Sequence, residues 1–313
     1  GSHLVDYILA NQSETDVSGL VRWRSPMENL NHVPVDKIKL FYGDLMDLGS
    51  LIRILKEINP DVIFHLAAQS YVPTSFDAPV DTLQTNIIGT TNLLEAVRIN
   101  ALDPVVHICS SSEVYGQVRK DEIPINEDCP LRPASPYAVA KAGEDMIALQ
   151  YWISYGIKTL RTRMFTHTGP RRGKVFVVSA FARQIALIEK GEQEPVLKVG
   201  NLDSVRTFAD VRDAVRAYWL LVNECEPGEV YNVGGDRTMN IGEMLDMLLH
   251  FSSVGDNIGI EVDPKLIRPS DVTLQIPDSS KFTKATGWKP EIKFEKTLED
   301  TLNYWRDHLK KER

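Results

Sequence analysis

Short apolar runs alternate with amphipathic stretches through the first half of this 313-residue chain, and this alternation constrains the fold more than any other feature. It is typical of a parallel β-sheet whose strands are joined by crossover helices. The runs 62–66 and 105–109 are almost entirely apolar, as expected of strands buried on both faces. The sequence predicts strands at Gly19–Val21, Lys39–Tyr42, Val62–Leu66, Val105–Cys109 and Lys158–Arg163, with helices at Leu48–Glu57, Val80–Arg98 and Pro136–Tyr155.

The second half of the chain is less regular. Helical spacing predicts helices at Phe176–Lys190, Ile241–Phe251 and Leu298–Leu309, whereas residues 255–277 suit loops and short strands. The chain carries no internal repeat and no low-complexity tract, so it is neither a solenoid nor a linker-rich scaffold. We expect an α/β fold, a doubly wound parallel sheet of the Rossmann-like kind, followed by a smaller C-terminal substrate-binding domain.

The N-terminus departs from the usual start of a dinucleotide-binding fold, which is a strand, a Gly-x-x-Gly-x-x-Gly turn and then a helix. Residues 1–9 (Gly-Ser-His-Leu-Val-Asp-Tyr-Ile-Leu) already have the pattern of that helix. Either the strand and most of the phosphate-binding loop are absent from this chain, or residues 1–3 are a cloning remnant. In both cases we expect the sheet to lack its first strand and Gly-rich loop, and cofactor binding to be severely weakened.

Composition narrows the functional class. Hydrophobic residues make up 43% and charged residues 25% of the chain, as in soluble globular proteins. No apolar run approaches the roughly 18 residues that a membrane span needs, and no cleavable signal is apparent. A net charge of −8 argues against a nucleic-acid partner. Three cysteines without a paired motif predict a reducing, cytoplasmic setting and no metal site.

A tyrosine and a lysine four residues apart are the first candidate catalytic groups. Residues 135–141 (Ser-Pro-Tyr-Ala-Val-Ala-Lys) put Tyr137 and Lys141 on one face of a helix. A tyrosine with a pKa of about 10 is a poor base at neutral pH, and a neighbouring ammonium stabilises the phenolate and lowers that pKa. The alternative is that Tyr137 packs at the helix start and Lys141 points to water.

The second group of candidates follows the strand that ends at Cys109, in residues 110–116 (Ser-Ser-Ser-Glu-Val-Tyr-Gly). Loops at the carboxyl ends of strands bind ligands in open α/β sheets. There the hydroxyl of Ser111 can hydrogen-bond a sugar oxygen, and the carboxylate of Glu113 can take or return a proton. The alternative is a serine-rich turn with an exposed glutamate.

Together these motifs resemble the extended short-chain dehydrogenase/reductase family, which acts on nucleotide sugars with a tightly bound nicotinamide cofactor. The resemblance runs through most of the chain. It rests on residues 43–45 (Gly-Asp-Leu), 65–70 (His-Leu-Ala-Ala-Gln-Ser), 86–90 (Asn-Ile-Ile-Gly-Thr), the Ser/Glu loop, Tyr137 and Lys141, Arg206, and 268–270 (Arg-Pro-Ser).

The resemblance implies roles for residues at the ends of two further strands. Asp44 and Leu45 should flank the adenine of the cofactor, and Leu66, Ala67 and Ala68 should line its middle. Alternatively, Asp44 only caps the following helix, and the small residues serve close packing between strand and helix. The resemblance further implies that Tyr137 and Lys141 contact the cofactor and that Gln69 contacts the substrate.

Charge at the end of the strand Gly19–Val21 discriminates between the two nicotinamide cofactors. NAD-binding folds usually place an acidic side chain there, whereas the 2′-phosphate of NADP favours arginine. Here the strand runs into Arg22, Trp23, Arg24 and Ser25, which indicates NADP, with a solvated basic turn as the alternative. Residues 1–165, with 205–235 returning to them, would then form the NADP-binding domain, and residues 166–204 and 236–313 the substrate-binding domain.

Within the family, the chain most resembles the GDP-mannose 4,6-dehydratases and their relatives, the GDP-4-keto-6-deoxymannose reductases. Residues 169–173 (Gly-Pro-Arg-Arg-Gly), 199–203 (Val-Gly-Asn-Leu-Asp) and 268–272 (Arg-Pro-Ser-Asp-Val) carry this resemblance. Arg206 and Arg268 are candidates to hold the diphosphate of a GDP-sugar, because a guanidinium grips it in bidentate fashion. Asn201 is a candidate to hydrogen-bond the nucleotide. Surface ion pairs are the alternative role for either arginine.

The resemblance implies an NADP-dependent lyase. Tyr137 would take the C4 hydroxyl proton, Ser111 would bond that oxygen, where the dehydratases carry threonine, and Glu113 would remove the C5 proton as water leaves C6. Residues 165–167 (Phe-Thr-His) replace the family's Phe-Asn-His, and the short segment 261–267 is closer to the reductases, whereas residues 171–173 favour a dehydratase. The alternatives are an NADPH-dependent reductase, another NDP-sugar dehydratase and, in a different class, a non-catalytic nucleotide-binding sensor.

Two helices suggest how copies of the chain associate. Members of the extended family commonly dimerise through a four-helix bundle, here built from Val80–Arg98 and Pro136–Tyr155. Among the GDP-mannose dehydratases, the loop that matches residues 22–25 reaches a neighbouring subunit in higher assemblies. We therefore expect a homodimer or a homotetramer.

Overall fold

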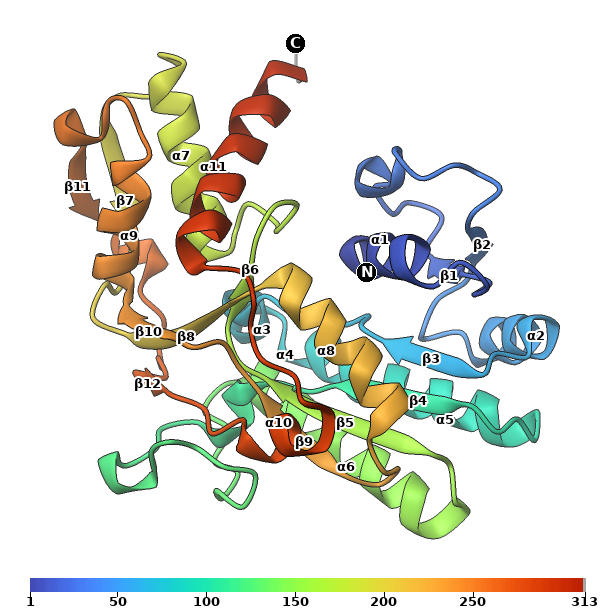
Figure 1. Ribbon diagram of the computed structural model, residues 1–313. Coiled ribbons are helices and arrows are strands. Elements are labelled where there is room, and N and C mark those ends of the chain that lie inside the picture. The colour runs from blue at the N-terminus through green and yellow to red at the C-terminus, as the bar shows by residue number, and fades with distance from the viewer. Residues whose placement is uncertain (312–313) are drawn as a thin grey trace.

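The strands of the first half, joined by two strands of the second half, form two parallel sheets in the computed structural model, which describes residues 1–311 (Figure 1). One sheet has two strands and the other has four, and no strand among the described residues hydrogen-bonds one of these sheets to the other. The predicted α/β fold with parallel sheets is confirmed. The first sheet pairs β1 (Ser18–Val21) with β2 (Lys39–Tyr42), and the second has the order β3 (Val62–His65), β4 (Val105–Cys109), β5 (Thr159–Met164), β9 (Val230–Val233).

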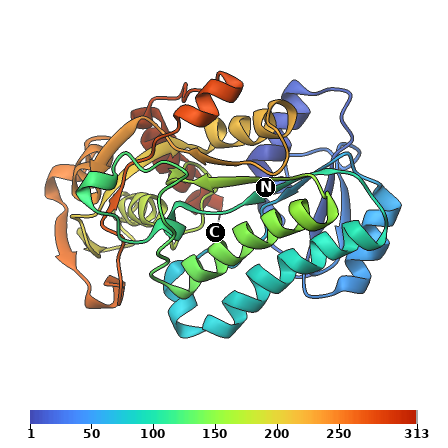
Figure 2. The ribbon, with the colours of Figure 1, turned by 90° about the horizontal axis from the view of Figure 1, so that it is seen from below.

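Helices cover both faces of the four-stranded sheet (Figures 1 and 2). One face packs against α2 (Leu48–Ile58), α5 (Gly89–Ile99) and α6 (Pro136–Tyr155), and the other against α1 (Ser2–Asn11) and α8 (Val211–Glu224). Leu51, Leu94 and Ile108 are buried in the first of these layers, and Leu160 and Leu221 in the second. Apolar strands between two helical layers are the doubly wound arrangement that the sequence predicts.

The predicted helix Val80–Arg98 forms, but it is not one regular α-helix. It follows α3 (Val72–Asp77) and consists of α4 (Pro79–Leu83), a π-helical turn at Gln84–Ile88 and α5. Asn86, which is fully buried, lies within this turn and makes a tertiary contact. Its side-chain amide accepts from the backbone N–H of Gln69 at 2.8 Å and donates to the Gln69 carbonyl at 3.0 Å. A π turn places such a side chain where a regular helix cannot, and such turns are frequent at functional sites.

The C-terminal half adds short strands and a helical layer with its own apolar core, seen beside the main sheet in Figure 1. The predicted helix Leu298–Leu309 begins earlier, at Phe294. The ring of Phe294 stacks on the ring of Phe208, with the two centroids 4.7 Å apart. The elements are β6 (His167–Thr168), α7 (Val177–Glu189), β7 (Val196–Val199), β8 (Val205–Asp210), β10 (Arg237–Asn240), α9 (Ile241–His250), β11 (Gly259–Val262), β12 (Leu274–Gln275), α10 (Ser280–Thr286) and α11 (Phe294–Lys311).

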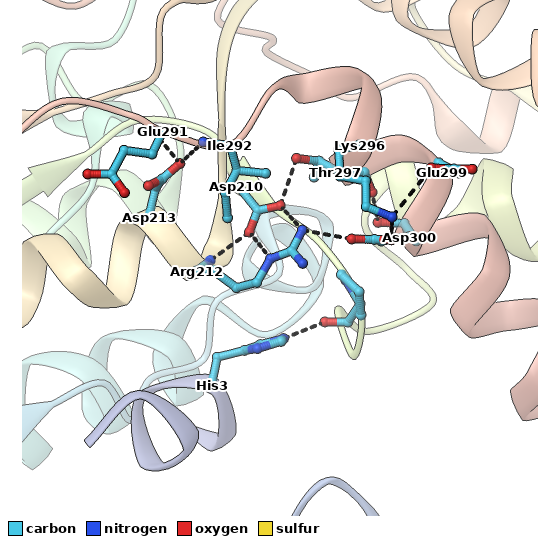
Figure 3. Close-up of polar contacts among 12 residues, drawn as sticks. His3, Asp210, Arg212, Asp213, Glu291, Ile292, Lys296, Thr297, Glu299 and Asp300 are labelled. Atoms are coloured by element: carbon cyan, nitrogen blue, oxygen red, sulfur yellow. Dashed lines mark hydrogen bonds and ion pairs between the residues drawn. The ribbon is translucent and has the colours of Figure 1, made fainter. Parts of the chain in front are cut away.

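Two buried carboxylates fix the C-terminal segment to the start of α8 (Figure 3). Asp210, at the end of β8, accepts a hydrogen bond from Thr297 Oγ1 of α11 at 2.7 Å. Asp213 accepts from the backbone N–H groups of Glu291 and Ile292 at 3.0 and 2.9 Å. Because charged acceptors make strong hydrogen bonds when buried, this junction holds β8 and α11 in one arrangement.

Among the described residues, no helix has the length and apolarity that crossing a membrane requires.

Candidate active site

A cavity of about 1280 Å³ lies at the carboxyl ends of the parallel strands. Residues from both halves of the chain line it, so groups that are far apart in sequence face one space. They include the four predicted catalytic residues and three of the predicted substrate-binding residues: Ser111, Glu113, Tyr137, Lys141, Asn201, Arg206 and Arg268.

The N-terminal turn of α6 positions the tyrosine and lysine. The Oγ of Ser135 caps the helix by accepting from the Ala138 N–H at 3.1 Å, and Pro136 occupies the first turn. Tyr137 and Lys141 are 8% and 5% exposed, so the alternative in which Lys141 points to water is wrong. The Lys141 ammonium instead donates to the Cys109 carbonyl at 2.8 Å.

The phenol of Tyr137 is subject to opposing influences. Burial raises its pKa, whereas the Lys141 ammonium and a hydrogen bond with Ser111 lower it. Burial prevails, so the pKa of Tyr137 lies above its ordinary value. The ammonium acts in the predicted direction, and its effect is opposed by the low-polarity surroundings.

The loop after β4 carries Ser111 and Glu113. Ser111 Oγ caps the short 3₁₀ helix Ser112–Tyr115 by accepting from the Glu113 N–H at 3.2 Å. The half-buried carboxyl of Glu113 lines the cavity. Burial raises its pKa against the opposing charges of Arg206 and Arg268. A carboxyl group with a raised pKa in a cleft is suited to proton transfer near neutral pH.

The carboxylate of Asp271 lies beside three of the predicted substrate-binding side chains, those of Asn201, Arg206 and Arg268. This carboxylate accepts from Asn201 Nδ2 at 3.0 Å and from Ser204 Oγ at 2.7 Å. Arg206 Nη2 lies 3.4 Å from one of its oxygens and Arg268 Nη1 lies 3.8 Å from the same oxygen. Two guanidinium groups that share one carboxylate are close enough to share one diphosphate. The sequence interpretation did not assign Asp271 a role, although its spacing of three residues from Arg268 is a signal for their pairing.

The predicted NADP residues Arg22, Arg24 and Ser25 follow the carboxyl end of β1, and both arginines are exposed. The guanidinium of Arg24 lies over the Trp23 ring, 4.6 Å from its centroid. None of the three residues lines the cavity. Their contact with a 2′-phosphate stays a prediction, and two exposed cations without a carboxylate among residues 22–25 suit that group.

The other predicted cofactor residues follow β2 and β3. Leu66 and Ala68 line the cavity, whereas Ala67, Asp44 and Leu45 do not. Asp44 accepts from the Met46 N–H at 2.9 Å in the turn before α2. The side chain that caps α2 is Asp47, which accepts from the Ser50 N–H at 3.3 Å, so the helix-capping alternative for Asp44 is wrong. The bond to Met46 leaves the predicted adenine contact of Asp44 untested.

The geometry at Gln69 does not support its predicted substrate contact. The side chain does not line the cavity. Its amide donates to the Tyr71 carbonyl at 3.1 Å and to Thr82 Oγ1 at 3.0 Å, and its oxygen accepts from the Tyr71 N–H at 2.6 Å. These bonds tie Gln69 into the loop that leads to α3, and its contact with substrate stays a prediction.

Sequence reasoning missed two charged residues near the catalytic pair. Arg172 lines the cavity with its guanidinium 3.7 Å from the ring centroid of Phe176, and burial lowers its pKa. The signal for it was its place in the motif 169–173. Glu144 is 1% exposed and accepts from the Lys141 ammonium at 3.0 Å. Its spacing of three residues from Lys141 was the available signal in the sequence. Among the described residues, no cluster of His, Cys, Asp or Glu could hold a metal ion.

A parallel α/β sheet with a buried Tyr/Lys pair and an acidic loop at its carboxyl edge defines a short-chain dehydrogenase/reductase of the type that modifies nucleotide sugars. The family model for GDP-mannose 4,6 dehydratase matches residues 1–301. The chain belongs to the GDP-mannose 4,6-dehydratase family. It is 36% identical over 332 residues to a GDP-mannose 4,6-dehydratase of Yersinia enterocolitica (94% of this chain, 88% of that one). It is also 36% identical over 269 residues to a GDP-6-deoxy-D-mannose reductase of Pseudomonas aeruginosa (86% and 88%).

Solved structures agree with this family. RMD from Pseudomonas aeruginosa complexed with NADPH has a TM-score of 0.82 and 32% identity, covering 94% of this chain and all of that one (100%). The dTDP-glucose 4,6-dehydratase DesIV from Streptomyces venezuelae, with NAD and TYD bound, has a TM-score of 0.86 and 27% identity, covering 98% and 94%. The expected relationship to nucleotide-sugar enzymes is therefore confirmed.

Proposed function

We propose that the protein is a GDP-mannose 4,6-dehydratase that converts GDP-mannose to GDP-4-keto-6-deoxymannose with NADP. The observation that carries the proposal is one cavity that is lined by Ser111, Glu113, Tyr137 and Lys141 together with Arg206 and Arg268. The family supports the substrate class, and the NADPH complex of the Pseudomonas structure supports the cofactor.

The roles of the cofactor-binding residues follow from their places in the fold. Arg22, Arg24 and Ser25 would hold the 2′-phosphate, because guanidinium groups recognise phosphate oxygens in bidentate fashion. Asp44 and Leu45 would flank the adenine. NADP held by these residues would supply the hydride chemistry that connects C4 and C6 of the sugar. Leu66, Ala67 and Ala68, at the end of β3, would line the middle of the cofactor.

The catalytic steps assign one task to each side chain. Tyr137, as the phenolate beside Lys141, takes the proton of the C4 hydroxyl, while Ser111 donates a hydrogen bond to that oxygen. The resulting 4-ketone acidifies the C5 proton. Glu113 removes this proton and delivers it to the hydroxyl that leaves C6, so that water departs. Return of the hydride to C6 would be balanced by a proton added at C5, which solvent supplies while Tyr137 releases the proton that it took from the C4 hydroxyl. Arg206, Arg268 and Asn201 hold the nucleotide in place during these steps.

Product analysis tests this proposal. The full-length protein, incubated with GDP-mannose and a catalytic amount of NADP, should give a product lighter by one water with no net change in NADPH absorbance. The absence of such a product across several NDP-hexoses would defeat the proposal. A non-catalytic sensor would give the same negative result, but the buried Tyr137 and Lys141 pair argues against that class.

A reductase is the second candidate. The 36% identity to the GDP-6-deoxy-D-mannose reductase and the short segment 261–267 favour it. This enzyme would consume NADPH in a one-to-one ratio with a 4-keto sugar nucleotide. Stoichiometric loss of NADPH absorbance with GDP-4-keto-6-deoxymannose, without dehydration of GDP-mannose, would identify it.

The fold suits a division into one domain that binds the cofactor and one that binds the substrate. We propose residues 1–165 with 205–235 as the NADP-binding domain and residues 166–204 and 236–313 as the substrate-binding domain. Their apolar cores are largely separate: one cluster joins α7, α9 and α11, and two others flank the main sheet. Phe282 and Trp288 are exceptions, because they pack with α1 and α8. Phe208 of β8 is another, because it packs in the cluster of α7, α9 and α11. The three cysteines are unpaired, which suits the proposed cytoplasmic location.

An exposed apolar line on α6 supports a homodimer. Val139, Met146 and Ile153 follow one another at intervals of seven residues and are 44%, 43% and 72% exposed. Figure 2 shows α6 beside α5 across one face of the molecule. Ile88 and Ile99, at the two ends of this neighbouring segment, are 45% and 49% exposed. A second copy of the same helix pair would bury these side chains in a symmetric interface.

A further inference from the structure

Glu144 is a buried acid on the catalytic face of α6 with no place in the mechanism above. Tyr137, Lys141, Glu144 and Ala148 follow one another at intervals of four, three and four residues, so they form one stripe along the helix. All four are buried. A carboxylic acid is unusual in such a stripe, because burying a charge is costly unless a partner compensates it.

The partner of Glu144 is the catalytic lysine. One carboxylate oxygen, Oε2, lies 3.0 Å from the Lys141 ammonium, and the side chains of Lys141 and Glu144 are 6% and 1% exposed. The other oxygen, Oε1, has no hydrogen-bond partner among the described residues. The carboxylate is thus held by Lys141, which is itself anchored to the Cys109 carbonyl.

Other charged and titratable groups surround this pair. Asp145, on the same helix, is compensated by Arg161 and Arg163 of β5 at 2.9 Å each. His65 of β3 and His107 of β4 lie near enough for the Lys141 charge to lower their pKa, and burial holds both at about 3, so they are neutral. Cys109, at the end of β4, and the buried guanidinium of Arg172 also interact electrostatically with Tyr137. Glu144 is the acid in direct contact with Lys141.

We propose that Glu144 is a positioning residue for the Tyr137–Lys141 pair, which holds the ammonium in place and sets the pH at which the Tyr137 phenolate forms. This inference rests on the proposed function, in which Tyr137 is the base. A negative charge beside Lys141 cancels part of the attraction that the ammonium exerts on the phenolate. The chain thus carries a Tyr-Lys-Glu triad in which the acid opposes ionisation of the tyrosine.

The titration directions agree with this geometry. Burial lowers the pKa of Lys141, but the charges of Glu144 and Tyr137 outweigh this effect and raise it. Burial raises the pKa of Glu144 to about 7, against the pull of Lys141. The Glu144 charge also raises the pKa of Tyr137. Glu144 therefore gains its charge, and its opposition to the phenolate, as pH rises through neutrality.

A tyrosinate titration tests the inference without requiring activity. The difference in tyrosinate absorbance between the wild type and Tyr137→Phe isolates Tyr137, and the same difference is measured in the Glu144→Gln background. Removing the Glu144 charge should move the Tyr137 titration down by about one pH unit, since charges a few ångströms apart interact at this level in a protein interior. An unchanged titration, or one that moves up, would overturn the inference.

Two further variants guard against a purely structural effect. Glu144→Ala removes the same charge with a side chain that matches Ala140 and Ala148 nearby, and it should shift the titration in the same direction as Glu144→Gln. Glu189→Gln is the matched control, because Glu189 also accepts from one basic residue, Arg306, at 2.7 Å, but lies at the far end of α7. It should leave the Tyr137 titration unchanged, and a shift as large as that of Glu144→Gln would contradict a specific role.

Kinetics add a readout that separates this inference from the proposed function. The first turnover of GDP-mannose with NADP should show its acid limb about one pH unit lower in Glu144→Gln than in the wild type. If the wild type forms no NADPH in the first turnover, the proposed function fails, whereas the tyrosinate titration still decides the role of Glu144. An identical acid limb in an active Glu144→Gln variant would overturn the inference.

Discussion

At the residue scale, burial is the largest influence on every shifted ionisable group described around the cavity. It raises the pKa of Glu113 and Tyr137 and lowers that of Arg172 and Arg206. Buried cations with lowered pKa values lack full compensation by nearby acids. A diphosphate would supply the missing negative charge, which is why an anionic substrate suits this cavity better than a neutral one.

Glu113→Gln should stop the reaction after the first hydride transfer. The amide cannot take the C5 proton, so dehydration should slow by a factor of about 10²–10⁴, as expected for loss of a general base. Because the Tyr137 step is intact, NADPH should accumulate in the first turnover, which absorbance measures directly. Dehydration at the wild-type rate would show that Glu113 is not the base.

The pH dependence of the elimination step has a defined sign. Glu113 acts as a base only when it is ionised, and burial raises its pKa above the ordinary 4.5. Elimination should therefore fall off at a higher pH than an ordinary glutamate would give, as the medium becomes more acidic. A pH profile of product formation measures this limb, and a midpoint at or below 4.5 would contradict the burial argument.

Arg206→Lys should weaken substrate binding more than it slows the chemistry. A lysine keeps the charge but loses the bidentate fork, so KM for the GDP-sugar should rise by roughly 10–100-fold with little change in kcat. Steady-state kinetics measure both. Arg237→Lys is the control, since Arg237 is an exposed arginine on β10 that lies outside the cavity lining. Equal KM changes in the two variants would argue against a diphosphate contact.

At the scale of elements, local sequence signals determine where α6 begins and ends, whereas tertiary contacts accompany the irregular turn before its neighbour α5. The predicted and observed bounds of α6 are the same, because Ser135, Pro136 and Gly156, with its left-handed φ of 69°, mark both ends. The π turn before α5 could not be predicted, since the hydrogen bonds that accompany it join Asn86 to the distant Gln69. Phe294 likewise extends α11 by packing on Phe208.

The buried histidines of β3 and β4 should make the protein sensitive to acid. Burial lowers the pKa of His65 and His107 to about 3, against about 6.5 for an unfolded histidine. The unfolded chain then binds protons that the native state excludes. Stability should be fully present above pH 6.5 and should fall as pH drops from 6.5 toward 3, by up to about 1.4 kcal/mol per pH unit for each histidine.

His107→Gln tests this dependence by urea unfolding at pH 7 and pH 5. The variant should lose less stability than the wild type between these two values, because one titrating group is gone. His250→Gln, at an exposed position on α9, should behave as the wild type. The same pH dependence in His107→Gln and the wild type would contradict the assignment of a buried neutral imidazole.

At the scale of the whole molecule, the cavity depends on residues that no sequence pattern brings together. Ser111, Glu113, Tyr137 and Lys141 could be predicted because each lies in a short motif at a strand end or a helix start. The roles of Asp271 and Glu144 could not, because they arise from side-chain contacts within the folded chain. Gln69 lies in a motif that predicts a substrate contact. In the structure its side-chain amide donates to the Tyr71 carbonyl and to Thr82 Oγ1, which the motif did not indicate.

Assembly should depend on the apolar line of α6. Ile153→Glu places a charge in the proposed interface, so analytical ultracentrifugation should show a monomer where the wild type shows a dimer or tetramer. Val35→Glu introduces the same charge at a residue that is 95% exposed and lies in the loop between β1 and β2. It should leave the assembly unchanged. A wild-type monomer, or an Ile153→Glu variant of unchanged mass, would contradict the proposed interface.

The central claim is that one cavity moves a hydride from C4 to C6 of a single sugar while Glu113 and Tyr137 handle the protons. GDP-mannose that carries deuterium at C4 tests it most directly, with mass spectrometry and NMR of the product. The proposed dehydratase should give a product that has lost one water and carries the deuterium at C6, with NADP needed only in catalytic amount. Deuterium that appears in NADPH formed in stoichiometric amount, or a sugar product that has not lost one water, would contradict the proposed hydride transfer.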